Sequence, residues 1–220
     1  MLTNPSPAEA TDQTETWPTN KNPLDSPSTG QDLNWTTEAD TFQVTSNHLE
    51  PTSVLGANTV ARCTDVVATQ NHRVIADYVA VISAGTGPTL VVGCRKDGAN
   101  DTYYGIRVTR DTTLNISRFS KFVSGTQTIF ETISNDVGSP GSMFVQANGS
   151  TIDATAGVNV HATKVDTAIV NFLNMRVSLL ANVATSDAQF DNVRQFDLGG
   201  VGIGTGGGPV PLRTILGVGQ

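Results

Sequence analysis

The sequence predicts an all-β protein, namely an antiparallel β-sandwich with an extended segment at each end. Short apolar runs with an alternating pattern follow one another through the middle of the chain, separated by turn residues. No segment sustains the period of an amphipathic helix. Only 15% of the residues are charged, and Thr, Ser, Asn and Gly are frequent, which is typical of β-rich proteins rather than helical bundles.

The length of 220 residues suits one sandwich domain with additional segments. We predict an extended N-terminal arm at residues 1–33, the sandwich at residues 34–198 and a Gly-rich C-terminal docking tail at residues 199–220. The first segment is rich in proline and small polar residues, so it offers little apolar surface to bury.

The predicted strands are short alternating runs bounded by turn residues. The clearest is Arg73–Ser83, whose even-numbered residues from Val74 to Ile82 are apolar. Asp97-Gly98 and Asn148-Gly149 predict hairpin turns, because glycine adopts positive φ without strain. In chain order, strands are expected at Trp35–Val44, within Val54–Val67, and at Arg73–Ser83, Leu90–Arg95, Tyr103–Arg110, Leu114–Phe119, Thr128–Ile133, Met143–Ala147, Thr151–Ala154 and Thr167–Leu173.

The stretch Met175–Arg194 predicts a hairpin that closes the domain. Its second strand carries the sequence FDNVR, in which Phe190 and Val193 can both be buried only if a bulge lies between them or the strand is buried on both faces. The first strand alternates, which predicts one buried face with Met175, Val177, Leu179 and Ala181 and an opposite face with Arg176, Ser178 and Asn182.

The final strand, AQFDNVR at residues 188–194, resembles that of concanavalin A-like lectin and glucanase jelly rolls, the group that includes laminin-G-like modules. The order of strands and turns from about Trp35 to Leu198 is also similar. The resemblance implies a jelly-roll sandwich. It leaves function open, since this fold is found in glycan-binding proteins, glycoside hydrolases and structural modules.

The sequence lacks the residues that an enzyme of this fold would need. The resemblance implies two catalytic carboxylates on one strand, as in Glu-x-Asp-x-x-Glu, yet Glu131 has no such neighbour. The histidines His48, His72 and His161 lie in different segments without a nucleophile elbow, so we expect each in a loop or at the surface. We therefore expect a protein without catalytic activity.

A glycan site is predicted near one turn, where hydroxyl-binding side chains and aromatic rings are close in sequence. Because neighbouring strand residues face opposite sides, one of the two tyrosines should belong to the core. The candidate carbohydrate-binding residues are Asp97, Asn100, Asp101, Tyr103 and Tyr104.

A structural calcium ion is a second candidate ligand. In relatives of the resembled fold, an aspartate of the last strand joins backbone carbonyls around calcium, and the matching position is Asp191. The alternative is that Asp191 accepts backbone N–H groups or pairs with Arg194.

The net charge of −7 argues against nucleic-acid binding, because no cluster of Lys and Arg is evident. The N-terminus lacks the features of a signal peptide, and no apolar run is long enough for a membrane helix. Cys63 and Cys94 are expected to be buried thiols, with a disulfide as the alternative.

The composition of the two termini predicts docking onto partner proteins; the alternative is that both termini fold back on their own domain. Apolar residues at the end of the glycine-rich tail could anchor an extended peptide in a groove; they are Val210, Leu212, Ile215, Leu216 and Val218. Chains of this make-up look like virion components of tailed bacteriophages.

The leading hypothesis is therefore a structural virion protein, made in the host cytoplasm. It would be a minor tail, tail-tip or capsid decoration protein that binds other virion proteins and assembles as a homo-oligomer. The alternative is a carbohydrate-binding module that recognises a host-surface polysaccharide.

Overall fold

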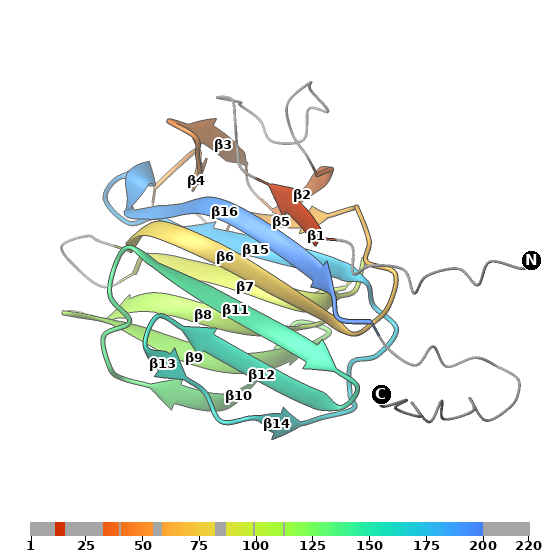
Figure 1. The fold of residues 1–220 in the computed structure, drawn as a ribbon. Helices are drawn as coiled ribbons and strands as arrows, with labels where there is room; N and C mark the ends of the chain where they lie inside the picture. Colours follow the sequence, from red (N-terminus) through yellow and green to blue (C-terminus); the bar gives the residue numbers. More distant parts are fainter. Residues whose placement is uncertain are drawn as a thin grey trace, which may run out of the picture.

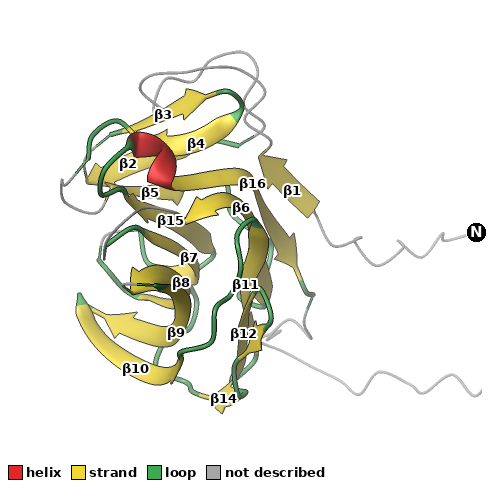
Figure 2. Ribbon diagram, turned by 90° about the vertical axis from the view of Figure 1, so that its left-hand side faces the viewer, coloured by secondary structure: helices red, strands yellow, loops and turns green. Residues whose placement is uncertain are grey.

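The chain folds into two antiparallel β-sheets packed face to face (Figures 1 and 2). The computed structural model describes residues 12–15, 33–39, 41–54, 59–81, 87–98, 100–111 and 113–199. Within these ranges the only helical element is a single 3₁₀ turn, η1 (Thr185–Asp187). The predicted all-β sandwich is confirmed.

The first sheet has nine strands. Its main order is β13 (Asn159–Val160), β12 (Thr151–Ala156), β11 (Gly141–Asn148), β6 (His72–Val81), β16 (Ala188–Asp197), β4 (His48–Pro51) and β3 (Phe42–Thr45). In addition, β1 (Asp12–Glu15) pairs with β16, and β14 (Lys164–Val165) pairs with β12.

The second sheet has seven strands and curves in Figure 2. The order is β10 (Thr126–Ile133), β9 (Leu114–Val123), β8 (Tyr103–Asp111), β7 (Thr89–Lys96), β15 (Asn174–Leu180), β5 (Thr59–Cys63) and β2 (Trp35–Ala39).

The core lies between the two sheets and follows from the period of two along each strand. Val74, Ala76 and Tyr78 of β6 face it from one sheet, while Leu90 and Val92 of β7 face it from the other, and all five are buried. Cys63 and Cys94 also lie in this core as buried thiols rather than as a disulfide, as the sequence favoured.

The prediction of a closing hairpin is wrong, because β15 and β16 belong to different sheets. Between them, bends and η1 carry the chain across the end of the sandwich, where the Asp187 carboxylate accepts the backbone N–H groups of Val183 and Ala184 at 2.8 and 2.9 Å. The predicted alternation along β15 is confirmed. So is the bulge in β16, whose register shifts on both sides of Phe190.

The predicted strand at Thr167–Leu173 is also wrong, since this segment pairs with no other strand. Its backbone donors bond to side chains instead: the N–H of Ile169 donates to Tyr104 Oη at 3.2 Å, and that of Asn171 to Gln70 Oε1 at 2.9 Å. Asn171 also has φ of 65°, which lies outside the β region. Ile169 is buried in the core, and Phe172 packs against that core.

The segment predicted as one strand at Trp35–Val44 is divided, since β2 and β3 lie in different sheets. The expectation that each histidine lies in a loop or at the surface is wrong for His72, which is buried in β6; His161 lies in a loop, as expected, and is buried there. The segments around these histidines are short and flanked by polar residues, so the sequence does not indicate that the histidines are buried. Their burial results from the packing of the two sheets.

The two terminal segments lie mostly outside the described residues. Four residues of the predicted N-terminal arm form β1, which pairs with Val193–Phe196 of β16. The proposed docking residues Val210, Leu212, Ile215, Leu216 and Val218 lie outside the part of the chain that the structure describes. Within that part, no helix has the length and apolar character needed to cross a membrane.

Candidate functional site

The outer face of the seven-stranded sheet carries polar and aromatic side chains, and no further layer of the described residues covers it. On β8, Tyr104 and Ile106 face the core, so Tyr103, Gly105 and Arg107 face outward. The registers of β9, β7 and β15 bring their outward residues into rows beside these.

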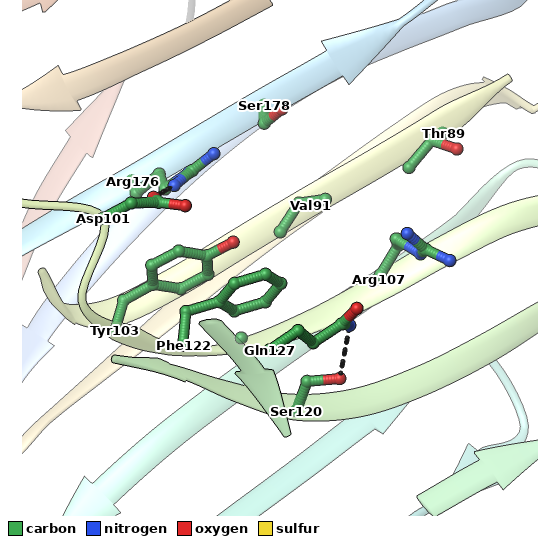
Figure 3. Close-up of a pocket in the computed structure, with 11 residues that line it drawn as sticks. Thr89, Val91, Asp101, Tyr103, Arg107, Ser120, Phe122, Gln127, Arg176 and Ser178 are labelled. Carbon is green, nitrogen blue, oxygen red and sulfur yellow. Dashed lines mark hydrogen bonds and ion pairs between the residues drawn. The ribbon is translucent and has the colours of Figure 1, made fainter. Parts of the chain in front are cut away.

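These rows form a pocket of about 270 Å³, close to the lower end of the range for ligand pockets (Figure 3). Five strands and the turn before β8 contribute to it. The lining residues are Thr89, Val91, Asp101, Tyr103, Gly105, Arg107, Ser120, Phe122, Gln127, Arg176 and Ser178.

Tyr103 lies at the centre of this pocket and close to the sheet, because two glycines leave room for its ring. A Cβ atom added to Gly93 would lie 2.6 Å from Tyr103 Cδ2, and one added to Gly105 would lie 2.7 Å from Cε2. The ring stacks on Phe122, with centroids 4.5 Å apart and planes at 10°. On its other side the guanidinium carbon of Arg176 lies 4.4 Å from the ring centroid (Figure 3).

We expect Gly93→Ala to displace the Tyr103 ring and to disrupt its stack with Phe122. Forcing a methyl group into this contact should lower the free energy of unfolding by about 1–3 kcal/mol. Urea unfolding of the variant measures this loss. Gly98→Ala is the matched control, since the nearest atom to its new Cβ would be 3.8 Å away; an equal loss in both variants would contradict the account.

One end of the pocket is lined with ion pairs. Arg176 pairs with Asp101, and Glu38 of β2 bridges Arg62 at 3.1 Å and Lys96 at 3.3 Å. Burial lowers the pKa of Arg176 to about 10, partly offset by the charge of Glu38, so this guanidinium remains protonated at neutral pH.

The structure separates the five predicted glycan-binding residues. Asp101 and Tyr103 line the pocket. Tyr104 lies in the core, and its hydroxyl donates to Asp166 Oδ1 at 2.6 Å. Asp97 and Asn100 bond to each other within the turn and do not line the pocket.

Most of the pocket was missed by sequence reasoning, because its residues come from strands far apart in the chain. Phe122, Ser120 and Gln127 belong to β9 and β10, whose sequences contain no recognisable binding motif. The Gln127 amide donates to Ser120 Oγ at 3.0 Å. The sequence of β15 does indicate part of the pocket, because its alternation places Arg176 and Ser178 on the face opposite the core.

A second constellation joins a serine, a histidine and a carboxylate. Ser117 Oγ lies 2.9 Å from His161 Nε2, and His161 Nδ1 lies 3.2 Å from Glu131 Oε2. The connectivity is that of a catalytic triad. However, the Ser117 side chain is fully buried and also accepts a hydrogen bond from Asn159 at 3.1 Å, so no substrate can reach it. We assign this cluster a structural role.

The candidate calcium residue, Asp191, lies on β16 and is partly exposed. Its carboxylate accepts a hydrogen bond from the neighbouring Asn192, while Arg194 pairs with Asp77 instead of with Asp191. In the described ranges, no three side chains of the metal-binding types gather at one point. Calcium binding by Asp191 with backbone carbonyls stays a prediction.

Comparison of the sequence with known proteins gives no match to a family model or to a curated protein. The fold, in contrast, is shared with solved structures. The legume lectin-like domain from Entamoeba histolytica has a TM-score of 0.54 at 13% identity, over 76% of this chain and 91% of that one. The Bacillus licheniformis β-glucanase has a TM-score of 0.53 at 10% identity, over 86% and 99%.

The carbohydrate-binding module CBM66 from Bacillus subtilis is also similar, with a TM-score of 0.52 at 14% identity, over 67% of this chain and 92% of that chain. At these identities the likeness establishes the fold alone, which is the concanavalin A-like jelly roll that the final strand suggested.

Proposed function

We propose that this protein binds carbohydrate in the pocket on the outer face of the seven-stranded sheet. The carrying observation is the stacked pair Tyr103 and Phe122 on the pocket floor, surrounded by groups that hydrogen-bond hydroxyls. An aromatic face suits the apolar face of a sugar ring, and a few fixed polar groups around it provide orientation. Structures of similar fold include a carbohydrate-binding module and a lectin-like domain, which supports the proposal.

We further propose that the protein binds its ligand without cleaving it. A glycosidase needs two carboxylates flanking the scissile bond, about 5–5.5 Å apart for retention or about 6.5–9.5 Å apart for inversion. Among the residues that line the pocket, Asp101 alone carries a carboxylate, and it is paired with Arg176. This arrangement favours a binding module over a hydrolase.

The test is the affinity of Phe122→Ala for a polysaccharide selected from a panel by wild-type binding. Loss of one stacking surface should weaken binding about tenfold or more, since aromatic contacts of this kind contribute about 1–3 kcal/mol. Isothermal titration calorimetry measures the effect, and reducing-end assays on the same samples detect any cleavage.

Phe144→Ala is the matched control. Phe144 belongs to β11 in the other sheet and likewise has an arginine over its ring, with the guanidinium carbon of Arg73 at 5.0 Å. Its removal should leave binding unchanged. Wild-type affinity in Phe122→Ala, or equal loss in both variants, would place the binding site elsewhere; release of reducing ends would contradict the non-catalytic assignment.

The virion hypothesis draws on different residues from the binding site. It depends on the terminal segments, which apart from β1 lie outside the described residues, and it stays a prediction together with the virion partners and the homo-oligomer. A carbohydrate-binding pocket is compatible with such a role, and the two are separable because the pocket belongs entirely to the sandwich.

A further inference from the structure

We propose, on the premise of the glycan site above, that its ligand is an acidic saccharide whose carboxylate or sulfate groups are bound by Arg107 and Arg118. These two residues lie directly opposite each other on β8 and β9. Arg107 lines the pocket, and Arg118 stands beside it on the same outward face.

Neither guanidinium is neutralised by the protein. No ion pair joins Arg107 or Arg118 to an acidic side chain of the described residues, and the Nε atom of each is buried without a hydrogen-bond partner. Burial lowers the pKa of Arg107, and the charge of Arg118 lowers it further, whereas Tyr103 acts in the opposite direction. The two guanidinium groups therefore repel each other and lack a counter-charge when the pocket holds no anion.

Like charges directly opposite each other on neighbouring strands are destabilising. An oxyanion between them would remove the repulsion and accept hydrogen bonds from both guanidinium groups, whose planar shape matches carboxylate and sulfate. The other cations at this face differ in this respect. Arg176 is already paired with Asp101, and Arg62 with Glu38, so Arg107 and Arg118 are the groups left for a ligand.

The distribution of charge over the chain also supports an acidic ligand at this face. The protein carries a net charge of −7, yet four of its thirteen basic residues gather on this outer face. Among the described residues, Glu38 and Asp101 are the acidic groups that pair with them. The four basic residues are Arg62, Arg107, Arg118 and Arg176.

A saccharide fits this surface better than a nucleic acid. The two aromatic rings beside the arginines are stacked on each other, which leaves fewer free ring faces for stacking a series of bases. The remainder of the chain is acidic and would repel a long phosphate backbone.

The experiment compares three polysaccharides and one nucleic acid as probes. Heparin supplies sulfate groups, polygalacturonate supplies carboxylates, dextran is neutral, and a single-stranded DNA oligonucleotide is the non-saccharide polyanion. The wild type and Arg107→Gln/Arg118→Gln are titrated with each by calorimetry at 50 and 200 mM NaCl. Arg73→Gln, on the outer face of the other sheet, is the control.

We expect the wild type to bind heparin, polygalacturonate or both at least tenfold more tightly than dextran, and the double variant to lose that difference. Whichever acidic probe binds more tightly identifies sulfate or carboxylate as the natural group. Arg73→Gln should behave as wild type. The melting temperature of the double variant should equal or exceed that of the wild type, because the substitution removes a repulsion, so weaker binding would not reflect misfolding.

Equal affinity for dextran and the acidic probes, or an unchanged preference in the double variant, would overturn the acidic-saccharide inference while leaving the glycan site intact. DNA bound as tightly as the best acidic saccharide would overturn it as well, since any polyanion would then suffice. If no polysaccharide of the wider panel binds, charged or neutral, the proposed function itself fails.

Discussion

Acidification from pH 7 to pH 4 is expected to remove about 3 kcal/mol from the free energy of unfolding through His72 alone. Burial lowers the pKa of this imidazole from 6.5 to about 3, and the charge of Arg95 lowers it further, against a smaller opposing effect of Asp197. Its Nε2 accepts the backbone N–H of Arg95 at 3.1 Å, so the ring is neutral in the fold and is best protonated after unfolding.

The sign follows from which state binds the proton. Below pH 6.5 the unfolded chain protonates His72 while the folded chain does not, so stability falls by about 1.4 kcal/mol per pH unit until the pH approaches 3. Burial also lowers the pKa of His161, which adds to the loss in the same direction.

Urea unfolding at pH 7, 5.5 and 4 measures this dependence. His72→Gln should be less stable than the wild type at pH 7, because it loses buried ring contacts, but its stability should fall less steeply with pH. His48→Gln, at a partly exposed position, is the control for replacing a histidine with glutamine. Parallel slopes for the wild type and His72→Gln would show that this imidazole is not held neutral.

The second large effect is expected for Arg95→Met, with a loss of about 3 kcal/mol or more. The Arg95 side chain is fully buried and joins three segments through backbone carbonyls. Its donors reach Gln70 O at 2.8 Å, Ile169 O at 2.9 Å and Gly149 O at 2.7 Å. Methionine fills the space but donates no hydrogen bond, which leaves those carbonyls without this partner.

A local irregularity of β7 explains why the Arg95 side chain reaches these three segments. Arg95 has φ of 50°, and the pairing with β15 shifts at this point, from Gly93 opposite Arg176 to Lys96 opposite Asn174. This bulge turns the side chain toward the end of the sandwich, where the loops meet. Hydrogen exchange should therefore show the loop that includes Ile169 opening in Arg95→Met.

Arg73→Met tests whether replacing any arginine of this sandwich lowers the free energy of unfolding as much as replacing Arg95 does. Arg73 is partly buried on the outer face of β6 and bonds to Gln146 through its side chain. We expect it to cost less than about 1 kcal/mol. Equal losses for Arg73→Met and Arg95→Met would contradict the assignment of Arg95 as the residue that holds the three loops together.

Much of the fold was predictable because strand formation depends on local alternation. The long strand from Arg73 and the inward row of β15 follow from a period of two, and the Asn148-Gly149 turn follows from the positive φ of glycine. The bulge at Phe190 was one of two alternatives, because burial of both Phe190 and Val193 required either a bulge or a strand buried on both faces.

The pairing of strands was not predictable in the same way. Whether β15 and β16 form a hairpin or cross between sheets depends on which neighbours each strand finds, and β15 finds β5 and β7. The candidate site could not be predicted for the same reason, since it depends on how the strands pair. Tyr103 and Asp101 are close in sequence, but Phe122 and Arg176 reach the ring of Tyr103 only through the register of four strands.

The measurement that tests the central claim most directly is an NMR titration of the isotope-labelled protein with the polysaccharide fragment that binds best. If the outer face of the seven-stranded sheet is the binding site, the perturbed amides will cluster on β7, β8, β9 and β15, with the largest shifts at Tyr103, Phe122 and their neighbours. Shifts confined to the outer face of the nine-stranded sheet, around Arg73 and Phe144, would contradict the assignment.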